Sequence, residues 1–394
     1  MMERAVRSCI KSKGYGRLLN WVAFTGMVLC MHACSARLHT AVEQPVTVFE
    51  PGAVYKSTRI PALVYTKQGA LLAFCEGRIG TASDWADMNL IMRRSKDGGN
   101  NWEPIVIIDS MKGGPVGNPT PIVDADGTIH LLYQRDYAEG FYTCSKDDGN
   151  SWSKPVNITE TYNAFRPEYD WKVLAPGPGH GIQLKNGRLL SAVWLANSAR
   201  LTPRRSHSPS CVATIYSDDQ GKTWKRGAII ADSSAQIANP NESMPVQLAD
   251  GSVLMSIRSP SKQQRRAFSK SATGSGGWTG TQFANALFDP TCMAPIIALP
   301  KLRPEGKAAL LFVNPDSRDI EKHPRRNLSA KLSFDEGATW GFNKVIDPGP
   351  SGYSDLAVDK NGTVYCLYET AGKDRDFNYK LVLKKLPAKW FQKK

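Results

Sequence analysis

The sequence is poor in the residue spacings that hold a metal ion or a disulfide framework. Its 394 residues include 6 histidines without an HxxxH pair and 8 cysteines without a CxxC pair. Three cysteines lie in or beside the N-terminal leader, at Cys9, Cys30 and Cys34. The other five cannot all pair, so we expect no metal site and interpret them as small, buried, apolar residues: Cys75, Cys144, Cys211, Cys292 and Cys366.

Long apolar runs and nucleotide-binding loops are also missing. No run near the ~20 uncharged apolar residues of a membrane span occurs after the first 35 positions. No glycine-rich loop follows a strand and opens a helix, so we expect no cofactor. The formal charge is +14, but the basic residues are scattered and not collected into arms, which argues against a nucleic-acid partner. A diffuse positive field suits an acidic small molecule.

The N-terminus has the pattern of an export signal. A basic segment precedes an apolar run over residues 18–30, and a small-residue segment follows. Ala33 directly before Cys34 resembles a bacterial lipoprotein processing site, in which the cysteine is lipidated and begins the mature chain. Ordinary cleavage near Ala36 is the alternative. We expect residues 1–33 to be removed and the protein to be exported, as a cell-surface or outer-membrane lipoprotein, into the periplasm, or by secretion.

Four octapeptides share the pattern Ser-x-Asp-x-Gly-x-x-Trp. They are Ser95–Trp102, Ser145–Trp152, Ser217–Trp224 and Ser333–Trp340. Ser and Asp side chains cap backbone groups in a tight turn, glycine takes a positive φ, and tryptophan pins the turn to the layer below. Each octapeptide, called an Asp box below, predicts a β-hairpin turn. We interpret the box aspartates as scaffold and not as active-site residues: Asp97, Asp147, Asp219 and Asp335.

Short apolar or alternating runs follow glycine-containing turns, and their β-branched and aromatic content predicts strands. They cover residues 71–75, 129–133, 188–194, 253–257, 308–313 and 363–368. The widest gap between boxes contains Ser269–Trp278, which resembles a box that has lost its Asp and gained residues. The boxes predict an all-β fold, a six-bladed β-propeller over residues 49–394 that follows a linker over residues 34–48.

Six short motifs along the chain point to one family. They are TRIP (58–61), NPTP (118–121), GPGHGIQL (177–184), DPTC (289–292), GYSDL (352–356) and LYE (367–369). With the boxes, they resemble the exo-sialidases (neuraminidases), six-bladed propellers of bacteria and animals. The family has Phe or Tyr where this chain has Thr58, and residues 293–295 also depart. The resemblance implies retaining hydrolysis of terminal sialic acids, with sialylated glycans, glycoproteins or glycolipids as partners.

Sialic acid carries a carboxylate on its anomeric carbon, which favours planar, bidentate cations that arginine supplies and lysine does not. Three arginines match the family's triad by their surroundings: Arg59 in TRIP, Arg258 in LMSIRS and Arg325 in HPRRNLS. Arg326 is an alternative to Arg325, and the R-x-N-L spacing favours Arg325.

Most glycosidases use two carboxylates, whereas sialidases use a tyrosine nucleophile. A neutral tyrosine avoids the repulsion that a carboxylate meets at a centre already carrying a carboxylate. By the resemblance, Tyr353 in GYSDL matches the nucleophile, and Glu242 in NPNES matches the base that deprotonates it.

The general acid is expected in the loop after the second strand. Arg78 resembles a further substrate-binding arginine, and the acid of bacterial members lies six residues beyond it, which gives Asp84. Asp87 is the alternative, or it contacts the substrate or holds the loop. Glu369 in LYE matches the glutamate that orients Arg59.

Several alternatives stay open at this point. Glu76 is a potential structural partner of Arg78, and His180 either lines the pocket or is structural. A trans-sialidase, which passes the sugar to an acceptor galactoside, needs an aromatic acceptor platform that the sequence does not locate. A non-catalytic sialic-acid-binding propeller is disfavoured by the intact Tyr353, Glu242 and Asp84.

Overall fold

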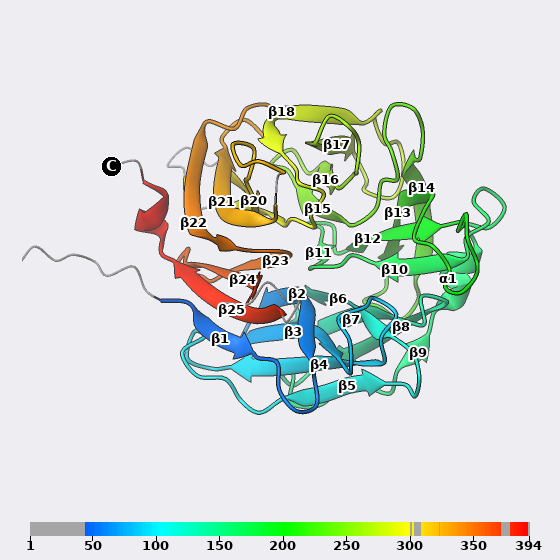
Figure 1. Ribbon diagram of the computed structural model, residues 1–394, viewed down its shortest axis with the longest axis horizontal. Coiled ribbons are helices and arrows are strands. Elements are labelled where there is room, and N and C mark those ends of the chain that lie inside the picture. The colour runs from blue at the N-terminus through cyan, green and yellow to red at the C-terminus, as the bar shows by residue number, and fades with distance from the viewer. Residues whose placement is uncertain (1–43, 300–301, 303–308, 323, 372–378, 393–394) are drawn as a thin grey trace, which may run out of the picture. The chain divides into compact units, whose positions relative to one another are not determined.

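Six antiparallel sheets follow one another along the chain in this computed structural model and surround a common centre as blades (Figure 1). The structure describes residues 44–299, 302, 309–322, 324–371 and 379–392. The chain divides into Met1–Val42 and one unit over Glu43–Lys394. The expected export signal, Cys34 and most of the expected linker lie outside the described residues. The prediction of an all-β, six-bladed propeller is confirmed.

Consecutive strands are neighbours within each blade except in blade three, where β10 and β11 both pair with β12. Blades one and two contain β2 (Ser57–Tyr65), β3 (Leu71–Arg78), β4 (Met88–Ser95) and β5 (Val106–Ser110), then β6 (Val116–Val123), β7 (Ile129–Arg135), β8 (Glu139–Ser145) and β9 (Val156–Asn157). After α1 (Thr159–Asn163), blade three contains β10 (Val173–Pro176), β11 (Ile182–Gln183), β12 (Leu189–Ala196), β13 (Ser210–Ser217) and β14 (Lys225–Asp232). Blades four and five contain β15 (Ser243–Gln247), β16 (Val253–Ile257), β17 (Arg265–Ser271) and β18 (Gln282–Phe288), then β19 (Ile296–Leu299), β20 (Ala309–Pro315), β21 (Arg326–Ser333) and β22 (Phe342–Pro350).

The last blade joins the two ends of the described chain. It consists of β23 (Ser354–Val358), β24 (Val364–Ala371), β25 (Tyr379–Leu386) and β1 (Val46–Phe49), and the short helix η1 (Ala388–Phe391) follows. β1 pairs antiparallel with β25, with Val46 opposite Leu383. The propeller therefore begins at Val46, three residues before the start expected at residue 49.

The core lies between neighbouring blades. Leu63 of the first blade packs in one cluster with Leu367 of the last, and Phe74 of the first packs in another with Leu131 of the second. Because neighbours cover both faces of a blade, a central strand such as β3 is buried at every residue. Such strands do not show the strict alternation of a sheet with one wet face.

The box turns are built as the sequence predicts. Asp219 accepts hydrogen bonds from the Thr223 N–H and hydroxyl at 2.9 and 2.6 Å and from the Ser217 hydroxyl at 2.7 Å. Gly221, at φ +80°, donates its N–H to Ser217 Oγ at 2.8 Å. Equivalent bonds occur in the other three boxes. The hydrogen bonds from Thr223 lower the pKa of Asp219 to about 2.

The fifth box differs from the prediction. Each intact box starts at the last residue of its blade's third strand, and in blade four that residue is Ser271 and not Ser269. Ser271–Trp278 is again an octapeptide, with Thr273 at the Asp position, so it has lost its Asp without gaining residues. Ser271 Oγ accepts the Gly274 N–H at 3.0 Å, from the fourth position of the octapeptide and not from the fifth as in the intact boxes. This octapeptide therefore keeps the length of a box but forms a different turn.

We expect Asp219→Ala to lower the free energy of unfolding by about 1 kcal/mol, because the Thr223 and Ser217 donors lose their acceptor. Thermal unfolding should show the loss, while the pH profile of catalysis should match that of the unmodified protein. This contribution to stability is present above the pKa of an unfolded aspartate and is lost as pH falls towards about 2, since folding lowers this pKa. Abolished activity at full stability would contradict a scaffold role.

Four of the five cysteines after the leader are buried, and all five are free. The prediction of burial is wrong for Cys144, which is only half-buried. This residue lies near the end of β8, directly before the second box, where its backbone N–H donates to Ser153 Oγ. Within the described ranges, no group of three or more His, Cys, Asp or Glu side chains is placed to hold a metal ion. The described helices include none long and apolar enough to cross a membrane.

Candidate active site

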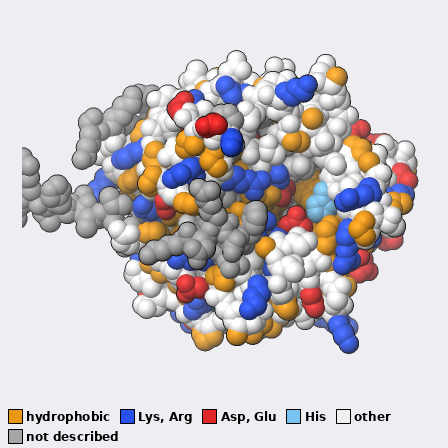
Figure 2. Space-filling model, in the orientation of Figure 1, with side chains coloured by type: hydrophobic (Ala, Val, Ile, Leu, Met, Phe, Trp, Pro, Cys, Tyr) orange, Lys and Arg blue, Asp and Glu red, His pale blue; other side chains and the backbone are white. Residues whose placement is uncertain are grey.

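The candidate site is a polar cavity of about 230 Å³ where the inner strands of the blades begin. Tyr353 and Glu242 directly precede the innermost strands β23 and β15, while Arg258 directly follows β16 and Arg325 directly precedes β21. In antiparallel blades these ends lie on one face, and the boxes lie at the other ends of the third strands. Figure 2 shows basic side chains beside acidic side chains and a histidine near the middle of the face in view.

Three arginines surround the ring of Tyr353. The guanidinium carbons of Arg59, Arg325 and Arg258 lie 5.3, 5.4 and 5.8 Å from the ring centroid. These side chains come from blades one, five and four, so the ring closure of the propeller brings them together. Three positive charges at one end of a small cavity suit a carboxylate ligand.

The Tyr353 hydroxyl is hydrogen-bonded to a carboxylate and to a guanidinium group. Its hydroxyl donates to the two carboxylate oxygens of Glu242 at 2.7 and 2.8 Å and accepts from Arg258 at 2.9 Å. Arg258 also forms an ion pair with Glu242. Burial raises the pKa of Tyr353 well above its ordinary value, although the nearby arginines oppose this. The hydroxyl is therefore neutral at ordinary pH, and Glu242 is placed to take its proton.

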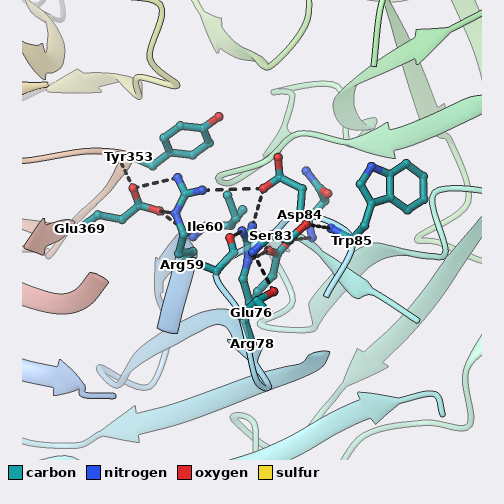
Figure 3. A network of polar contacts seen from close by, with 12 residues as sticks. Arg59, Ile60, Glu76, Arg78, Ser83, Asp84, Trp85, Tyr353 and Glu369 are labelled. Carbon is teal, nitrogen blue, oxygen red and sulfur yellow. Dashed lines mark hydrogen bonds and ion pairs between the residues drawn. The ribbon is translucent and has the colours of Figure 1, made fainter. Parts of the chain in front are cut away.

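Glu369 of β24 contacts Arg59, the arginine that the resemblance expects it to orient (Figure 3). It accepts from Arg59 Nε and NH2 at 3.1 and 3.2 Å and from the Tyr353 N–H at 3.0 Å. It also accepts the N–H of Ile60 at 3.0 Å, where the backbone has φ +61°. A β-branched residue is strained there, and the break in register that accompanies it turns Arg59 into the cavity. A Cβ at Gly352 would overlap the Glu369 carboxylate, which accounts for the glycine in GYSDL.

Glu76 of blade one makes contacts like those of Glu369, since each carboxylate pairs with an arginine and accepts a backbone N–H of the following blade. It accepts the N–H of Asn118 at 3.0 Å, again at positive φ before a proline, and it pairs with Arg78 at 2.6 Å. The Arg78 side chain is fully buried, and it lies behind Asp84 at 2.9 Å and not in the cavity wall. The structure thus places Arg78 in contact with the expected acid, whereas the sequence suggested a direct contact with substrate.

Asp84 lies on the cavity wall, on the loop between β3 and β4. Its side chain is 48% exposed, and it lies 3.7 Å from Arg59 NH1. Burial raises the pKa of Asp84, but the charges of Arg78 and Arg59 outweigh it and hold this pKa below the ordinary value. Asp87 is exposed at the end of the loop, where its carbonyl accepts the Ile79 N–H at 2.8 Å, and it does not line the cavity.

The neighbours Arg325 and Arg326 point to different places. Arg325 lines the cavity and donates to the Thr291 carbonyl at 2.6 Å, which gives the DPTC motif a role in holding it. Arg326 is exposed and donates to the Pro348 carbonyl at 3.3 Å. His180 does not line this cavity. Its Nδ1 pairs with Asp355 at 2.7 Å.

Sequence reasoning missed part of the cavity wall. Besides Asn118 and Asn241, the wall contains an aromatic group: Tyr137, Trp194 and His207. The polar atoms Asn118 Oδ1, Asn241 Oδ1, Trp194 Nε1 and His207 Nε2 are buried without a partner in the described structure, so they are available to a ligand. Asn241 could have been found beside Glu242, but no motif marks Tyr137 or His207, which lie on connections between strands.

The molecule is a six-bladed propeller with three arginines and a hydrogen-bonded tyrosine–glutamate pair in one cavity. The family model described as BNR repeat-like domain matches residues 68–366, and the chain belongs to this family. It is 29% identical over 357 residues to a sialidase of Micromonospora viridifaciens, with 83% of this chain and 52% of that protein covered. It is 29% identical over 321 residues to an exo-alpha-sialidase of Aspergillus fumigatus, with 73% and 70% covered.

A solved structure agrees with this assignment. The Hadza microbial sialidase Hz136 superposes with a TM-score of 0.71 at 27% identity, covering 87% of this chain and 69% of that one. The chain spans about half the length of the Micromonospora sialidase.

Proposed function

We propose that the protein is an exo-α-sialidase, a glycoside hydrolase that removes terminal sialic acids from glycoconjugates with retention. One observation carries this proposal: the Tyr353 hydroxyl is hydrogen-bonded to Glu242 at 2.7 Å inside a ring of three arginines. The arginines suit the substrate carboxylate, and the tyrosine–glutamate pair suits attack on the carbon that bears it. The sialidases similar to this chain support the substrate class.

In the proposed reaction, the Tyr353 oxygen attacks the anomeric carbon while its proton passes to Glu242. Asp84 gives a proton to the glycosidic oxygen, and the bond from that oxygen to the anomeric carbon breaks. Water then attacks the same carbon and gives a proton to Asp84, and Tyr353 departs and recovers its proton from Glu242. Two displacements at one carbon retain its configuration.

The low pKa of Asp84 in the free site has to be reconciled with its role as an acid. The charges of Arg78 and Arg59 outweigh burial and favour the ionised form. A bound substrate carboxylate would engage Arg59 and add a negative charge nearby. Both changes raise the pKa of Asp84, since both destabilise its anion. We therefore expect Asp84 to be a competent acid only when substrate is bound.

The test of the proposal is hydrolysis of a fluorogenic sialoside by the purified protein, with and without free lactose. Free sialic acid in both reactions is the expected result. Sialyl-lactose as the main product would identify a trans-sialidase. Tight binding of a sialic acid analogue without turnover would identify a non-catalytic binding propeller.

We expect Asp84→Ala to reduce kcat/KM for a natural sialoside by about 100-fold or more, because the leaving oxygen then departs without a proton. The leaving group of an activated aryl sialoside needs little protonation, so kcat/KM for that substrate should fall much less. Asp87→Ala is the matched control from the same loop and should leave both substrates nearly unaffected. If Asp84→Ala reduced kcat/KM equally for both substrates, Asp84 would not be the general acid. If Asp87→Ala reduced kcat/KM only for the natural sialoside, the role of general acid would belong to Asp87.

We also propose export by way of residues 1–33, with a lipid anchor at Cys34 or ordinary cleavage near Ala36. This rests on the charge and apolar pattern of the leader. The mass of the N-terminal peptide of the mature protein distinguishes these outcomes, and an uncleaved leader would contradict both.

A further inference from the structure

The acid loop, residues 79–87, carries Asp84 at the edge of the cavity. Its two ends are fixed, since Arg78 ends β3, Met88 begins β4, and the Ile79 N–H donates to the Asp87 carbonyl at 2.8 Å. The Asp84 carboxylate is half-exposed and pairs with Arg78 and Arg59, and Arg78 NH1 also donates to the Ala82 carbonyl at 2.5 Å. Ion pairs that are open to solvent hold a loop weakly. All of these contacts come from blade one, and an attachment to another blade would further restrict the position of the loop.

Trp85, the residue after Asp84, supplies that attachment. Its ring lies 5.0 Å from the ring of Tyr137 and 5.4 Å from that of His207. The guanidinium carbons of Arg205 and Arg204 lie 5.3 and 5.9 Å from the Trp85 ring. Aromatic pairs and cation–π contacts at these distances are both stabilising. In Figure 3 the Trp85 ring extends from the loop on the side away from Arg59 and Glu369.

The groups that receive Trp85 belong to two other blades. Tyr137 lies in the turn between β7 and β8, whereas Arg204, Arg205 and His207 lie in the connection between β12 and β13. Trp85 therefore ties a loop of blade one to blades two and three. Asp84 is held by arginines of blade one, and Trp85 is held by residues of blades two and three. The acid loop therefore bridges these blades at the edge of the cavity.

This receiving site is firmly built. Tyr137 is 3% exposed, and its N–H donates to Gln134 Oε1 at 2.5 Å. Its ring and that of His207 both contact Trp194 of β12, at 6.1 and 5.2 Å. Arg205 pairs with Asp136 at 2.8 Å, which joins the two connections. Trp85 thus docks against groups that are held by contacts of their own.

We propose that Trp85 is a positioning residue that fixes Asp84 for proton transfer by docking the acid loop between blades two and three. The inference rests on the proposed role of Asp84 as general acid. A general acid works only within hydrogen-bond reach of the leaving oxygen, and a misplacement of about 1 Å can cost up to about 100-fold in rate. Trp85 does not line the cavity, so it acts through Asp84 and not on the sugar.

The test uses Trp85→Ala in the full-length protein and a series of aryl sialosides whose leaving groups differ in pKa. We expect kcat/KM to fall by about 10- to 100-fold for the poorest leaving groups and less than about threefold for the best. The dependence on leaving-group pKa should become steeper, as it does for Asp84→Ala. Binding of a sialic acid analogue should change by less than about threefold, because the three arginines are untouched.

Two variants control for folding. Trp85→Phe keeps an aromatic ring at the docking site and should restore most of the lost activity on poor leaving groups. Trp152→Ala removes a tryptophan of the second box, which packs on Phe74 at 5.8 Å. It should cost stability without changing the dependence on the leaving group.

The outcomes separate this inference from the proposed function. If Asp84→Ala steepens the leaving-group dependence and Trp85→Ala does not, the positioning role is wrong and the acid role stands. If Trp85→Ala lowers kcat/KM by the same factor for all substrates, the effect is that of partial unfolding, as expected for Trp152→Ala, and Trp85 is only structural. If no sialoside is hydrolysed by the unmodified protein, the proposed function fails first.

Discussion

Tyr353→Phe is expected to lower kcat for a sialoside by on the order of 10³-fold or more while the protein folds normally. The change removes one oxygen atom, which is the atom proposed to bond to the anomeric carbon. The ring is 6% exposed and would keep its packing among the three arginines. Binding of a sialic acid analogue should therefore change by less than about tenfold, since the carboxylate partners remain.

Covalent labelling provides the direct measurement for this prediction. A fluorinated sialosyl inactivator should add its mass to the peptide that contains Tyr353, and Tyr353→Phe should remain unlabelled. Label on the peptide that contains Glu242 would instead indicate a carboxylate nucleophile. Because burial raises the pKa of Tyr353 well above its ordinary value, labelling requires Glu242 to take the proton.

Arg325→Ala is expected to weaken binding of a sialic acid analogue by about 2 to 3 kcal/mol, a factor of roughly 30 to 150 in Kd. The variant leaves a charge-assisted contact to the carboxylate unmade. Arg325 is the most direct member of the triad to test, because its side chain donates to a backbone carbonyl, that of Thr291 at 2.6 Å, and not to Tyr353 or Asp84. Calorimetry or inhibition kinetics measures the change.

Arg326→Ala is the matched control for this variant. Arg326 is the next residue and carries the same charge, but it is exposed and donates to a backbone carbonyl of β22. Its loss should change Kd by less than about twofold. A large effect of Arg326→Ala together with a silent Arg325→Ala would overturn the assignment of the triad.

Arg258→Ala and Arg59→Ala should weaken binding similarly, but each should also reduce kcat. Arg258 donates to the Tyr353 hydroxyl at 2.9 Å, and Arg59 lies 3.7 Å from Asp84. Removing either charge changes the pKa of a group proposed to act in catalysis. Arg325 should therefore affect chiefly KM, whereas these two should affect KM and kcat together.

Residues with a local motif could be assigned from sequence, and residues without one could not. Tyr353, Glu242 and Arg59 stand in short motifs. The neighbouring residues in these motifs have structural roles of their own, such as Gly352, which leaves room for the Glu369 carboxylate. Tyr137 and His207 stand in connections without a pattern, yet they line the same cavity. Arg78 has a motif, but its full burial behind Asp84 follows from packing that no motif encodes.

The repeating unit of the fold can be predicted from short stretches of the amino-acid sequence. A box needs only hydrogen bonds among residues within eight positions, so its turn, its strand ends and the count of blades can be read locally. Long-range packing determines which side chains meet in the cavity, the completion of the last blade by β1, and the docking of Trp85 on two other blades. Tyr353 and Glu242 are 111 residues apart, and Arg59 and Glu369 are 310 apart. Contacts at such separations exist only once all six blades have closed into a ring, because no local segment holds both partners.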